Sequence, residues 1–430
     1  MPLSFALLQL QRQLDAVSPC QQGFLHFSAA LGSSSEGLAW LAAQSLWPQF
    51  YWQAREGNET LIALGEVARA ETLDQAARLL NTLPEAGCLV GVNEFALQRC
   101  YLFLPRLLWR RERLNVYLYG DLYQQAQATL RMLSTLQPAV PLPALPTCPS
   151  ACQHSPDKQG WRARVALALQ AIKTGELEKV VLARATDVSF PEPLSPHALL
   201  AASREVNHHC YHFLLAQGPH QAFVGSSPER LYHRQGLALR TEALAGTCEN
   251  SKDALQASLW AEALFADEKN RRENGLVVED ICQQLHAVTQ GLDVAPAQIV
   301  RLRKVQHLRR EIQASLHQPD DKQILQQLQP TAAVAGLPRK AALNFIHHHE
   351  PFSRNWYAGS VGWLSAGESE FSVALRSAWV EKSSVRFYAG AGIVAGSEAD
   401  LEWQEINHKA SGLAGLAGVE IAEGSCPKSK

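Results

Sequence analysis

Lys179 is the first residue along the chain whose type and position would suit catalysis. It begins an apolar run that ends at Ala183, in which a period of two places Lys179, Val181 and Ala183 on one face of a strand. A lysine at a strand end usually extends its ammonium group into water. If the strand is buried instead, the lysine pKa is lowered and the amine can accept a proton as a general base.

Glu229 lies in a turn that follows a second apolar run. The turn extends from Gly225 to Arg230, and Pro228 stops the hydrogen-bonded ladder so that Glu229 lies beyond the strand end. A surface pair with Arg230 is the simpler interpretation. In a closed pocket the glutamate would stay protonated and could donate its proton as a general acid.

Carboxylates on two predicted helices form a further candidate site. Glu273 lies in a long helical pattern over residues 253–288, and Glu402 and Glu405 share a face with Lys409 in a pattern over residues 397–413. A Ser-x-x-Asp motif at residues 397–400 is predicted to cap the second helix. Most such carboxylates are only solvated. If the helices converge, their oxygens would suit Mg²⁺.

Two segments rich in small residues offer backbone groups to a ligand. The segment 389–394 contains Gly390 and Gly392, but the next glycine, Gly396, is spaced wrongly for a dinucleotide-binding loop. We expect a glycine loop at a strand end, with N–H groups that an anion can approach. Residues 241–247 are predicted to form a second small-residue loop after a strand.

Composition excludes several classes of protein. The 430 residues include 39 Lys and Arg against 41 Asp and Glu, and this near-neutral balance argues against a nucleic-acid surface. No window approaches the ~20 apolar residues of a transmembrane helix, and the N-terminus lacks the basic region of a signal peptide. The nine cysteines lack paired spacing, so we expect reduced thiols and a cytoplasmic protein. Cys148 and Cys152 with His154 lack a second ligand pair, which disfavours a zinc site.

A proline-rich segment divides the chain. Five prolines recur between Gln137 and Ser150, which blocks helix and ladder formation and indicates a connector. We therefore predict an N-terminal α/β region over residues 1–150 that packs against a catalytic region over residues 151–422, followed by a disordered tail over residues 423–430. Strands grouped between long helices, without regular alternation, predict an α+β fold with mostly antiparallel sheet.

Taken in order along the chain, these segments resemble the signatures of the chorismate-utilising enzymes. This family includes isochorismate, anthranilate, aminodeoxychorismate and salicylate synthases. The resemblance covers roughly residues 160–419 and implies the fold of anthranilate synthase component I, with large antiparallel sheets flanked by helices. The matching segments are Lys179–Arg184, Gly225–Arg230, Ala243–Thr247, Glu350–Gly362, Tyr388–Val394 and Glu402–Lys409.

Within the family, the chain is most similar to isochorismate synthases of the menaquinone pathway. Lysine at position 179 is typical of members that add water, whereas members that use ammonia usually carry glutamine there. Ala245 stands where aminodeoxychorismate synthases often carry a nucleophilic lysine, so covalent catalysis is not expected. The segment Gln329–Gly336 also resembles the isochorismate synthase loop. The resemblance implies an isomerase that converts chorismate to isochorismate with Mg²⁺.

The resemblance also assigns roles to single residues. Lys179 would be the base that activates water for addition at C2, and Glu229 the acid that protonates the hydroxyl leaving C4. Mg²⁺ would be held by Glu273 and Glu405, with Glu402 a further or alternative ligand. The substrate carboxylates would be bound by Arg376, Lys409 and the backbone of Gly390 and Gly392, and the ring would be lined by His307, Tyr357, Ala245, Gly246 and Thr247. Some relatives carry a glutamate where this chain has Asn270, so the surroundings of the metal are not assigned.

Three alternatives remain open at this point. The protein could be an isochorismate or salicylate synthase of a siderophore or salicylate pathway. It could also be an aminating anthranilate or aminodeoxychorismate synthase subunit, which would need an amidotransferase partner and which Lys179 disfavours. A non-catalytic chorismate-binding module is the weakest alternative, because no polar residue of the predicted site is missing. We expect no amidotransferase subunit, no nucleic-acid or membrane partner, and a chain able to act as a monomer.

Overall fold

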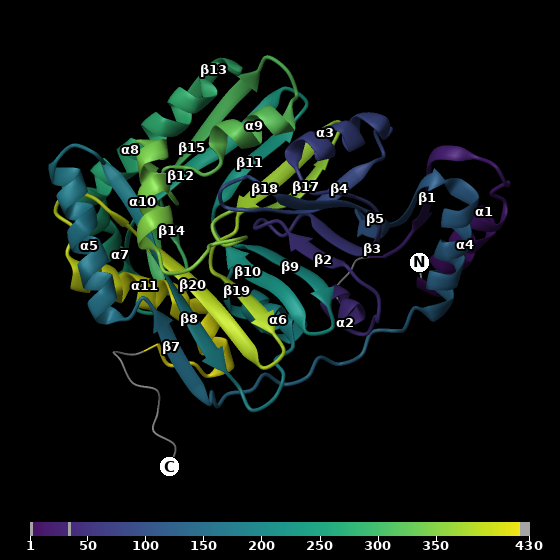
Figure 1. Ribbon diagram of the computed structural model, residues 1–430, viewed down its shortest axis with the longest axis horizontal. Helices are drawn as coiled ribbons and strands as arrows, with labels where there is room; N and C mark the ends of the chain where they lie inside the picture. Colours follow the sequence, from purple (N-terminus) through teal and green to yellow (C-terminus); the bar gives the residue numbers. More distant parts are fainter. Residues whose placement is uncertain (1–2, 33–35, 422–430) are drawn as a thin grey trace.

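The chain folds into two large antiparallel sheets that run into each other and are covered by helices (Figure 1). The computed structural model describes residues 3–32 and 36–421. The predicted α+β class with antiparallel sheet is confirmed. Within the described residues no helix is long and apolar enough to cross a membrane.

The first sheet contains β8, the strand that begins with Lys179, and ends with two strands of the N-terminal region, β2 and β3. Its neighbouring strands pair in the order β8, β20, β19, β10, β9, β2 and β3. Two short strands, β7 and β16, pair with the other edge of β8. The bounds are β7 (Ala151–Ser155), β8 (Lys179–Ser189), β16 (Gly336–Leu337), β20 (Ser384–Ile393), β19 (Ser377–Glu381), β10 (Gln221–Ser227), β9 (Tyr211–Gly218), β2 (Gln49–Gln53) and β3 (Thr60–Ala70).

The second sheet is reached through β5, which pairs with β3 across a register shift. From β5 one branch leads through β6 to β1, and the other through β4, β17, β18, β11 and β12 to β15, which also pairs with β13 and β14. The bounds are β1 (Gln22–Ala30), β4 (Cys88–Asn93), β5 (Cys100–Arg110), β6 (Arg113–Asp121), β11 (Arg230–Gln235), β12 (Ala238–Glu249), β13 (Thr289–Val294), β14 (Gln298–Arg301), β15 (Val305–Leu316), β17 (Ser360–Ser365) and β18 (Glu368–Val373).

The helices lie over these sheets and supply part of the site. α8 packs on β12 and α11 on β20, so each sheet presents one helix to the region between them. The bounds are α1 (Leu3–Asp15), α2 (Gly37–Ala42), α3 (Leu73–Thr82), α4 (Leu122–Thr135), α5 (Lys158–Lys173), α6 (Pro196–Val206), α7 (Ala254–Ala266), α8 (Glu268–Leu285), α9 (Asp321–Leu328), α10 (Arg339–His349), α11 (Ala399–Ala414) and the 3₁₀ turn η1 (Gly415–Ala417).

Strands from both sides of the proline-rich segment belong to the same sheets. β2 pairs with β9 and β4 pairs with β17, although the segment at residues 137–149 forms neither helix nor strand. The N-terminal strands are thus hydrogen-bonded neighbours of strands from the catalytic region. The boundaries 1–150 and 151–422 stay predictions, and the predicted tail over residues 423–430 lies outside the described residues.

Both long helical predictions need correction, the first at an internal break and the second at its N-terminal cap. The pattern over residues 253–288 forms two helices, α7 and α8, because Asp267 adopts an extended backbone and its side chain accepts a hydrogen bond from the Asn270 N–H. The predicted cap at residues 397–400 is wrong, since Glu398 precedes the first turn of α11 without a side-chain cap. Ser397 instead accepts a hydrogen bond from the Val394 N–H.

The two predicted small-residue loops are strands. Residues 241–247 belong to β12, whose pairing with β15 is interrupted only by a register shift between Leu244 and Thr247, where Gly246 has a φ of +83°. Gly390 and Gly392 lie within β20 and pair with Ala183 and Val181 of β8. Both corrections have the same reason: a neighbouring strand supplies hydrogen-bond partners that a local pattern of small residues does not reveal.

Candidate active site

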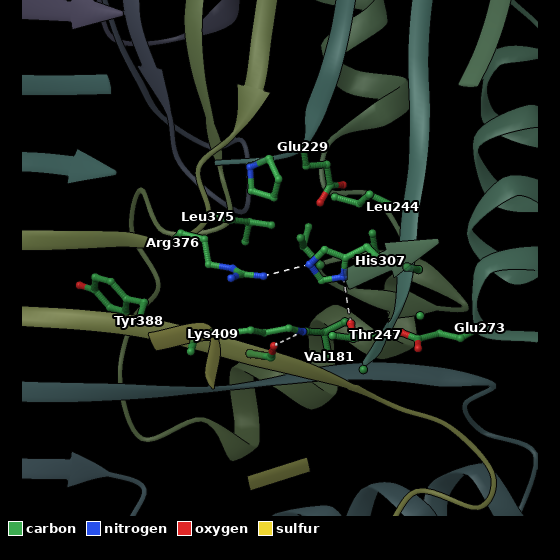
Figure 2. Close-up of a pocket in the computed structure, with 18 of the residues that line it drawn as sticks. Val181, Glu229, Leu244, Thr247, Glu273, His307, Leu375, Arg376, Tyr388 and Lys409 are labelled. Atoms are coloured by element: carbon green, nitrogen blue, oxygen red, sulfur yellow. Dashed lines mark hydrogen bonds between the residues drawn. The ribbon is translucent and has the colours of Figure 1, made fainter. Parts of the chain in front are cut away.

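A cavity opens between the two sheets, and residues of the predicted acid, metal-binding and substrate-binding groups line it (Figure 2). The empty space within and in front of it is about 660 Å³, a size suited to a small-molecule ligand. Among the predicted residues, the following line it: Glu229, Ala245, Gly246, Thr247, Glu273, His307, Tyr357, Arg376, Gly390, Gly392 and Lys409. Lys179, Glu402 and Glu405 do not line it but contact residues that do, or lie beside them.

Glu229 enters the cavity from the link between β10 and β11. Its side chain is buried, and burial, reinforced by the negative charge of Glu242, raises its pKa to about 8. Arg230 turns away to Glu56 and Glu370, so the predicted surface pair between Glu229 and Arg230 is not formed. Glu229 therefore carries a proton at neutral pH, as a general acid must.

Lys179 begins β8 and lies behind the cavity wall, against Gly392 of β20 and Glu273 of α8. Its side chain is 0% exposed, which excludes the solvated strand-end interpretation. The ammonium nitrogen is 3.0 Å from Glu273 Oε1 of α8. Burial alone would raise the pKa of Glu273, but the charge and hydrogen bond of Lys179, together with the charges of Lys409 and Lys269, lower it. The prediction for Lys179 considered burial alone and is thus incomplete, because the buried ammonium group also forms an ion pair with Glu273.

His307 connects both sheets at the centre of the cavity (Figure 2). Its Nε2 is 3.0 Å from Arg376 Nη2, and its Nδ1 is 3.1 Å from Thr247 Oγ1. A guanidinium group only donates hydrogen bonds, so Nε2 must accept, and in the neutral ring the proton is then on Nδ1 and points to Thr247. Burial, together with Arg376, lowers the pKa of His307 well below its usual value, which keeps the ring neutral.

Lys409 brings a second cation to the cavity from α11. Its ammonium group donates to the carbonyl oxygen of Gly390 at 3.0 Å and contacts Glu405 Oε1 at 2.5 Å. Arg376 lies on the neighbouring wall, immediately before β19. The cavity therefore presents two cations from different elements, spaced apart, as a ligand with two carboxylates requires.

The three predicted metal ligands form one cluster with lysines. Lys269 contacts Glu402 at 2.7 Å and is also attracted electrostatically by Glu273 and Glu405. Burial, followed by the like charge of Glu405, raises the pKa of Glu402. Within the described part of the chain, no three His, Cys, Asp or Glu side chains are grouped so that they could hold a metal ion. Each of these three carboxylates contacts a lysine.

These residues nevertheless fit Mg²⁺ by their chemistry. All are carboxylates on α8 and α11, of which Glu273 lines the cavity, and Mg²⁺ prefers such hard oxygen donors. The repulsion between Glu402 and Glu405 is an interaction that a divalent cation would relieve. The metal site itself stays a prediction.

Comparison with known proteins identifies the family. A family model described as chorismate binding enzyme matches residues 94–416, which is most of the chain. The chain belongs to the chorismate-binding enzymes. It is 50% identical over 428 residues to the isochorismate synthase MenF of Escherichia coli K12, with 97% of this chain and 99% of that protein covered. It is also 42% identical to the isochorismate synthase MenF of Haemophilus influenzae, with 89% of each covered.

Solved structures of chorismate-binding enzymes share the fold. The menaquinone-specific isochorismate synthase MenF from E. coli superposes with a TM-score of 0.93 at 50% identity, over 96% of this chain and 99% of that one. Anthranilate synthase component I from Streptococcus pneumoniae has a TM-score of 0.65 at 19% identity, a likeness of fold alone. The predicted family and fold are confirmed. Isochorismate synthases are isomerases, and the similarity to them identifies this member of the chorismate-binding enzymes as an isomerase.

Several residues that shape the site of this chorismate-binding enzyme escaped the sequence-based prediction. The side chain of Asn270 accepts a hydrogen bond from the Thr247 N–H, and Asn274 donates to the carbonyl oxygens of Ala243 and Ala245. Both asparagines therefore hold the irregular part of β12 against α8. Asn270 and Asn274 are four residues apart, a spacing that places them on one face of a helix and indicates a shared contact. Nothing in the sequence of α8 indicates which strand they contact.

A stacked pair of tyrosines closes one side of the cavity. The rings of Tyr357 and Tyr388 are parallel within 8°, with centroids 4.9 Å apart. Tyr388 was not predicted to line the site, although it begins one of the matching segments. Its ring points away from His307 (Figure 2), so it contributes a wall rather than a polar contact.

The Gly392→Ala substitution is expected to lower kcat/KM for the reaction of this site by about 10²-fold, the effect of a misplacement of about 1 Å. A Cβ at position 392 would overlap Glu273 Oε1 and lie 3.0 Å from Lys179 Cε, so the ion pair must move. Steady-state kinetics would measure the loss. Gly367→Ala is the control, because a Cβ there meets nothing within 4 Å. Equal kinetics of the two variants would contradict the requirement for this packing.

Proposed function

We propose that this protein is a Mg²⁺-dependent isochorismate synthase that converts chorismate to isochorismate. The observation that carries the proposal is a buried lysine and a protonated glutamic acid at one cavity. Lys179 is fully buried behind Glu273, which lines the cavity, and Glu229, with a pKa of about 8, lies in the cavity itself (Figure 2). A reaction that adds a hydroxyl group at one carbon and removes one at another needs both a base and an acid.

The proposed reaction is balanced by one water entering and one water leaving. The ammonium group of Lys179 first loses a proton, and the neutral amine then takes a proton from the attacking water as its oxygen bonds to C2 and the ring double bonds shift. The C–O bond at C4 breaks, and Glu229 donates its proton to the departing hydroxyl. Since Glu229 ends as a carboxylate and Lys179 as an ammonium group, the two groups must exchange a proton with solvent before the next turnover.

The remaining residues would bind the substrate by charge. Arg376 and Lys409 would each hold one carboxylate, and His307 orients Arg376 by accepting its N–H. Because the Nδ1 proton of His307 is donated to Thr247 Oγ1, the Thr247 hydroxyl hydrogen is left for another acceptor in the cavity. Ala245, Gly246 and Tyr357 would pack against the ring.

Glu273 and Glu405, with Glu402 beside them, would hold Mg²⁺. When bound, the metal supplies positive charge for the ring carboxylate of the substrate. Lys179, Lys269 and Lys409 would then share the carboxylates with the metal, and the two carboxylates of the substrate would balance the added positive charge.

The pathway we propose is menaquinone biosynthesis in the cytoplasm. The high identity to the menaquinone-specific enzyme of E. coli, over nearly all of both chains, supports this choice over the siderophore and salicylate pathways. A bacterial strain that lacks its own isochorismate synthases should regain menaquinone when it expresses this protein. Recovery of siderophore production alone would favour the alternative.

Chromatography of chorismate incubated with the purified protein tests the reaction directly. With Mg²⁺ and without ammonia, we expect isochorismate as the product. Added EDTA should abolish turnover, and excess Mg²⁺ should restore it, because removing the metal removes the positive charge proposed to bind the ring carboxylate of the substrate. Anthranilate formed with ammonia would establish an aminating enzyme, and salicylate would establish loss of pyruvate. Full activity in EDTA would contradict the metal requirement.

A further inference from the structure

The active-site cavity adjoins two outer cavities. One shares Tyr357 and Tyr388 with it and lies beyond the stacked tyrosine rings. The other shares Pro228, Arg376 and Lys409 with it, and includes the turn between β14 and β15. Each is a possible route by which a ligand passes between solvent and the site, and the two differ in charge.

The cavity beyond the tyrosines is acidic. Its charged groups include an ion pair between Asp187 and Arg386, at 2.6 Å, which cancels internally. Arg354 is buried and bound to Glu350, so its charge is also balanced. Glu94 and Glu381 remain, and no ion pair balances either of them within the described residues. A substrate with two negative charges is repelled from this route.

The cavity beside the β14–β15 turn is basic. Arg303 and Lys304 occupy the turn, both are exposed, and neither forms an ion pair with any residue that the structure describes. The exposed ring of His208 lies on the same rim. The acidic residue at the end of β12, Glu249, contacts His408 at 3.4 Å instead of these cations. Two cations of this rim are therefore available to a ligand.

The turn itself is anchored, so its cations are held at the rim. Leu302 packs in a small buried cluster with Cys210 and Val305, and its carbonyl oxygen accepts a hydrogen bond from Asn250. The Asn250 N–H in turn donates to the Lys304 carbonyl oxygen. These contacts use the backbone and the leucine side chain, so the side chains of Arg303 and Lys304 are not needed to form the turn.

We infer that the dianionic substrate enters through this basic cavity, and that Arg303 and Lys304 attract it before it contacts Arg376 and Lys409. The inference rests on the proposed function for the identity of the substrate. Arg376 and Lys409 border both the outer cavity and the active site, so the positive potential continues from the rim to the place of binding. A cleft lined by one sign of charge concentrates the oppositely charged ligand and raises its association rate.

The double variant R303Q/K304Q tests the inference. At about 10 mM ionic strength, where charges act over roughly 30 Å, we expect kcat/KM for chorismate to fall roughly 10-fold with kcat unchanged. At about 1 M salt, where the range is roughly 3 Å, the difference should nearly vanish. The matched control is R99Q/K173Q, which removes an exposed arginine and an exposed lysine from outside the cavity and changes the net charge equally.

Each outcome decides between routes. Equal kcat/KM for the double variant and the control at low salt would overturn the inference. A deficit that persists at high salt would also overturn it, because a direct contact would then replace long-range attraction. If the acidic cavity is the route, E94Q/E381Q should raise kcat/KM while R303Q/K304Q leaves it unchanged.

The proposed function and this inference can fail separately. Turnover of chorismate by the unaltered protein tests the function alone, and the ratio between variants tests the route. If the unaltered protein binds chorismate without converting it, stopped-flow tryptophan fluorescence gives the association rate for each variant. The same salt-dependent loss in R303Q/K304Q is then expected in that rate.

Discussion

Replacement of Lys179 by alanine is expected to reduce kcat for chorismate conversion by about 10²- to 10⁴-fold, the usual contribution of a general base. Water is a weak nucleophile, and Lys179 is the buried amine that contacts Glu273 of the cavity lining. The loss should appear in kcat more than in KM, because Arg376 and Lys409 still bind the carboxylates. Product formation followed by chromatography gives both constants.

The variant Lys179→Gln separates the loss of the base from the loss of the ion pair. Alanine leaves Glu273 without its nearest cation, and breaking a buried pair costs about 3–5 kcal/mol of stability. Glutamine can still donate a hydrogen bond to Glu273 but cannot accept the proton from water. Thermal denaturation should show a smaller loss of stability for glutamine, with both variants inactive. Lys173→Ala, at the exposed end of α5, is the control, and a folded Lys179→Gln protein with normal turnover would refute the assignment of the base.

Replacement of Glu229 by glutamine is expected to lower kcat by a similar factor of about 10²–10⁴. Glutamine matches the size and neutrality of the protonated acid, so binding of chorismate should change little. It has no acidic proton to give to the departing hydroxyl. Steady-state kinetics with product chromatography would show kcat reduced and KM nearly constant. Turnover close to that of the unaltered protein would mean that another group supplies this proton.

The pH profile gives a second measurement on the same group. Because the pKa of Glu229 is raised to about 8, its protonated fraction is high at neutral pH and falls as the pH rises through 8. The rate should therefore decline on the alkaline side with an apparent pKa near 8. Removing the charge of Glu242, in Glu242→Gln, takes away one cause of the raised pKa, so the decline should move to lower pH. An alkaline limb that does not move would show that it belongs to a different group.

The sequence alone predicted which residues carry the chemistry. Types and order along the chain indicated Lys179, Glu229, Glu273 and Glu405, because each stands in a short segment that resembles a family signature. A period of two and a proline after a strand also located Lys179 and Glu229 at strand ends correctly. The fold class followed from grouped strands without regular alternation.

Local patterns failed where hydrogen-bond partners come from distant segments. Residues 241–247 were expected to form a loop, and Gly390 and Gly392 were expected in another, yet β15 and β8 extend both into strands. The break at Asp267 was missed because charged residues that favour helix follow it directly, while its side chain caps a new helix. Strand pairing is decided by the whole sheet, and short windows do not contain that information.

What only the tertiary structure decided is how the charges meet. The sequence placed a lysine and several glutamates on separate elements, but not the pairing of Lys179 with Glu273 or the closeness of Glu242 to Glu229. It also gave no sign that Arg303 and Lys304 border the cavity of Arg376 and Lys409. Burial and charge–charge distances set protonation and attraction, and both arise only when β8, β12, α8 and α11 pack around one space.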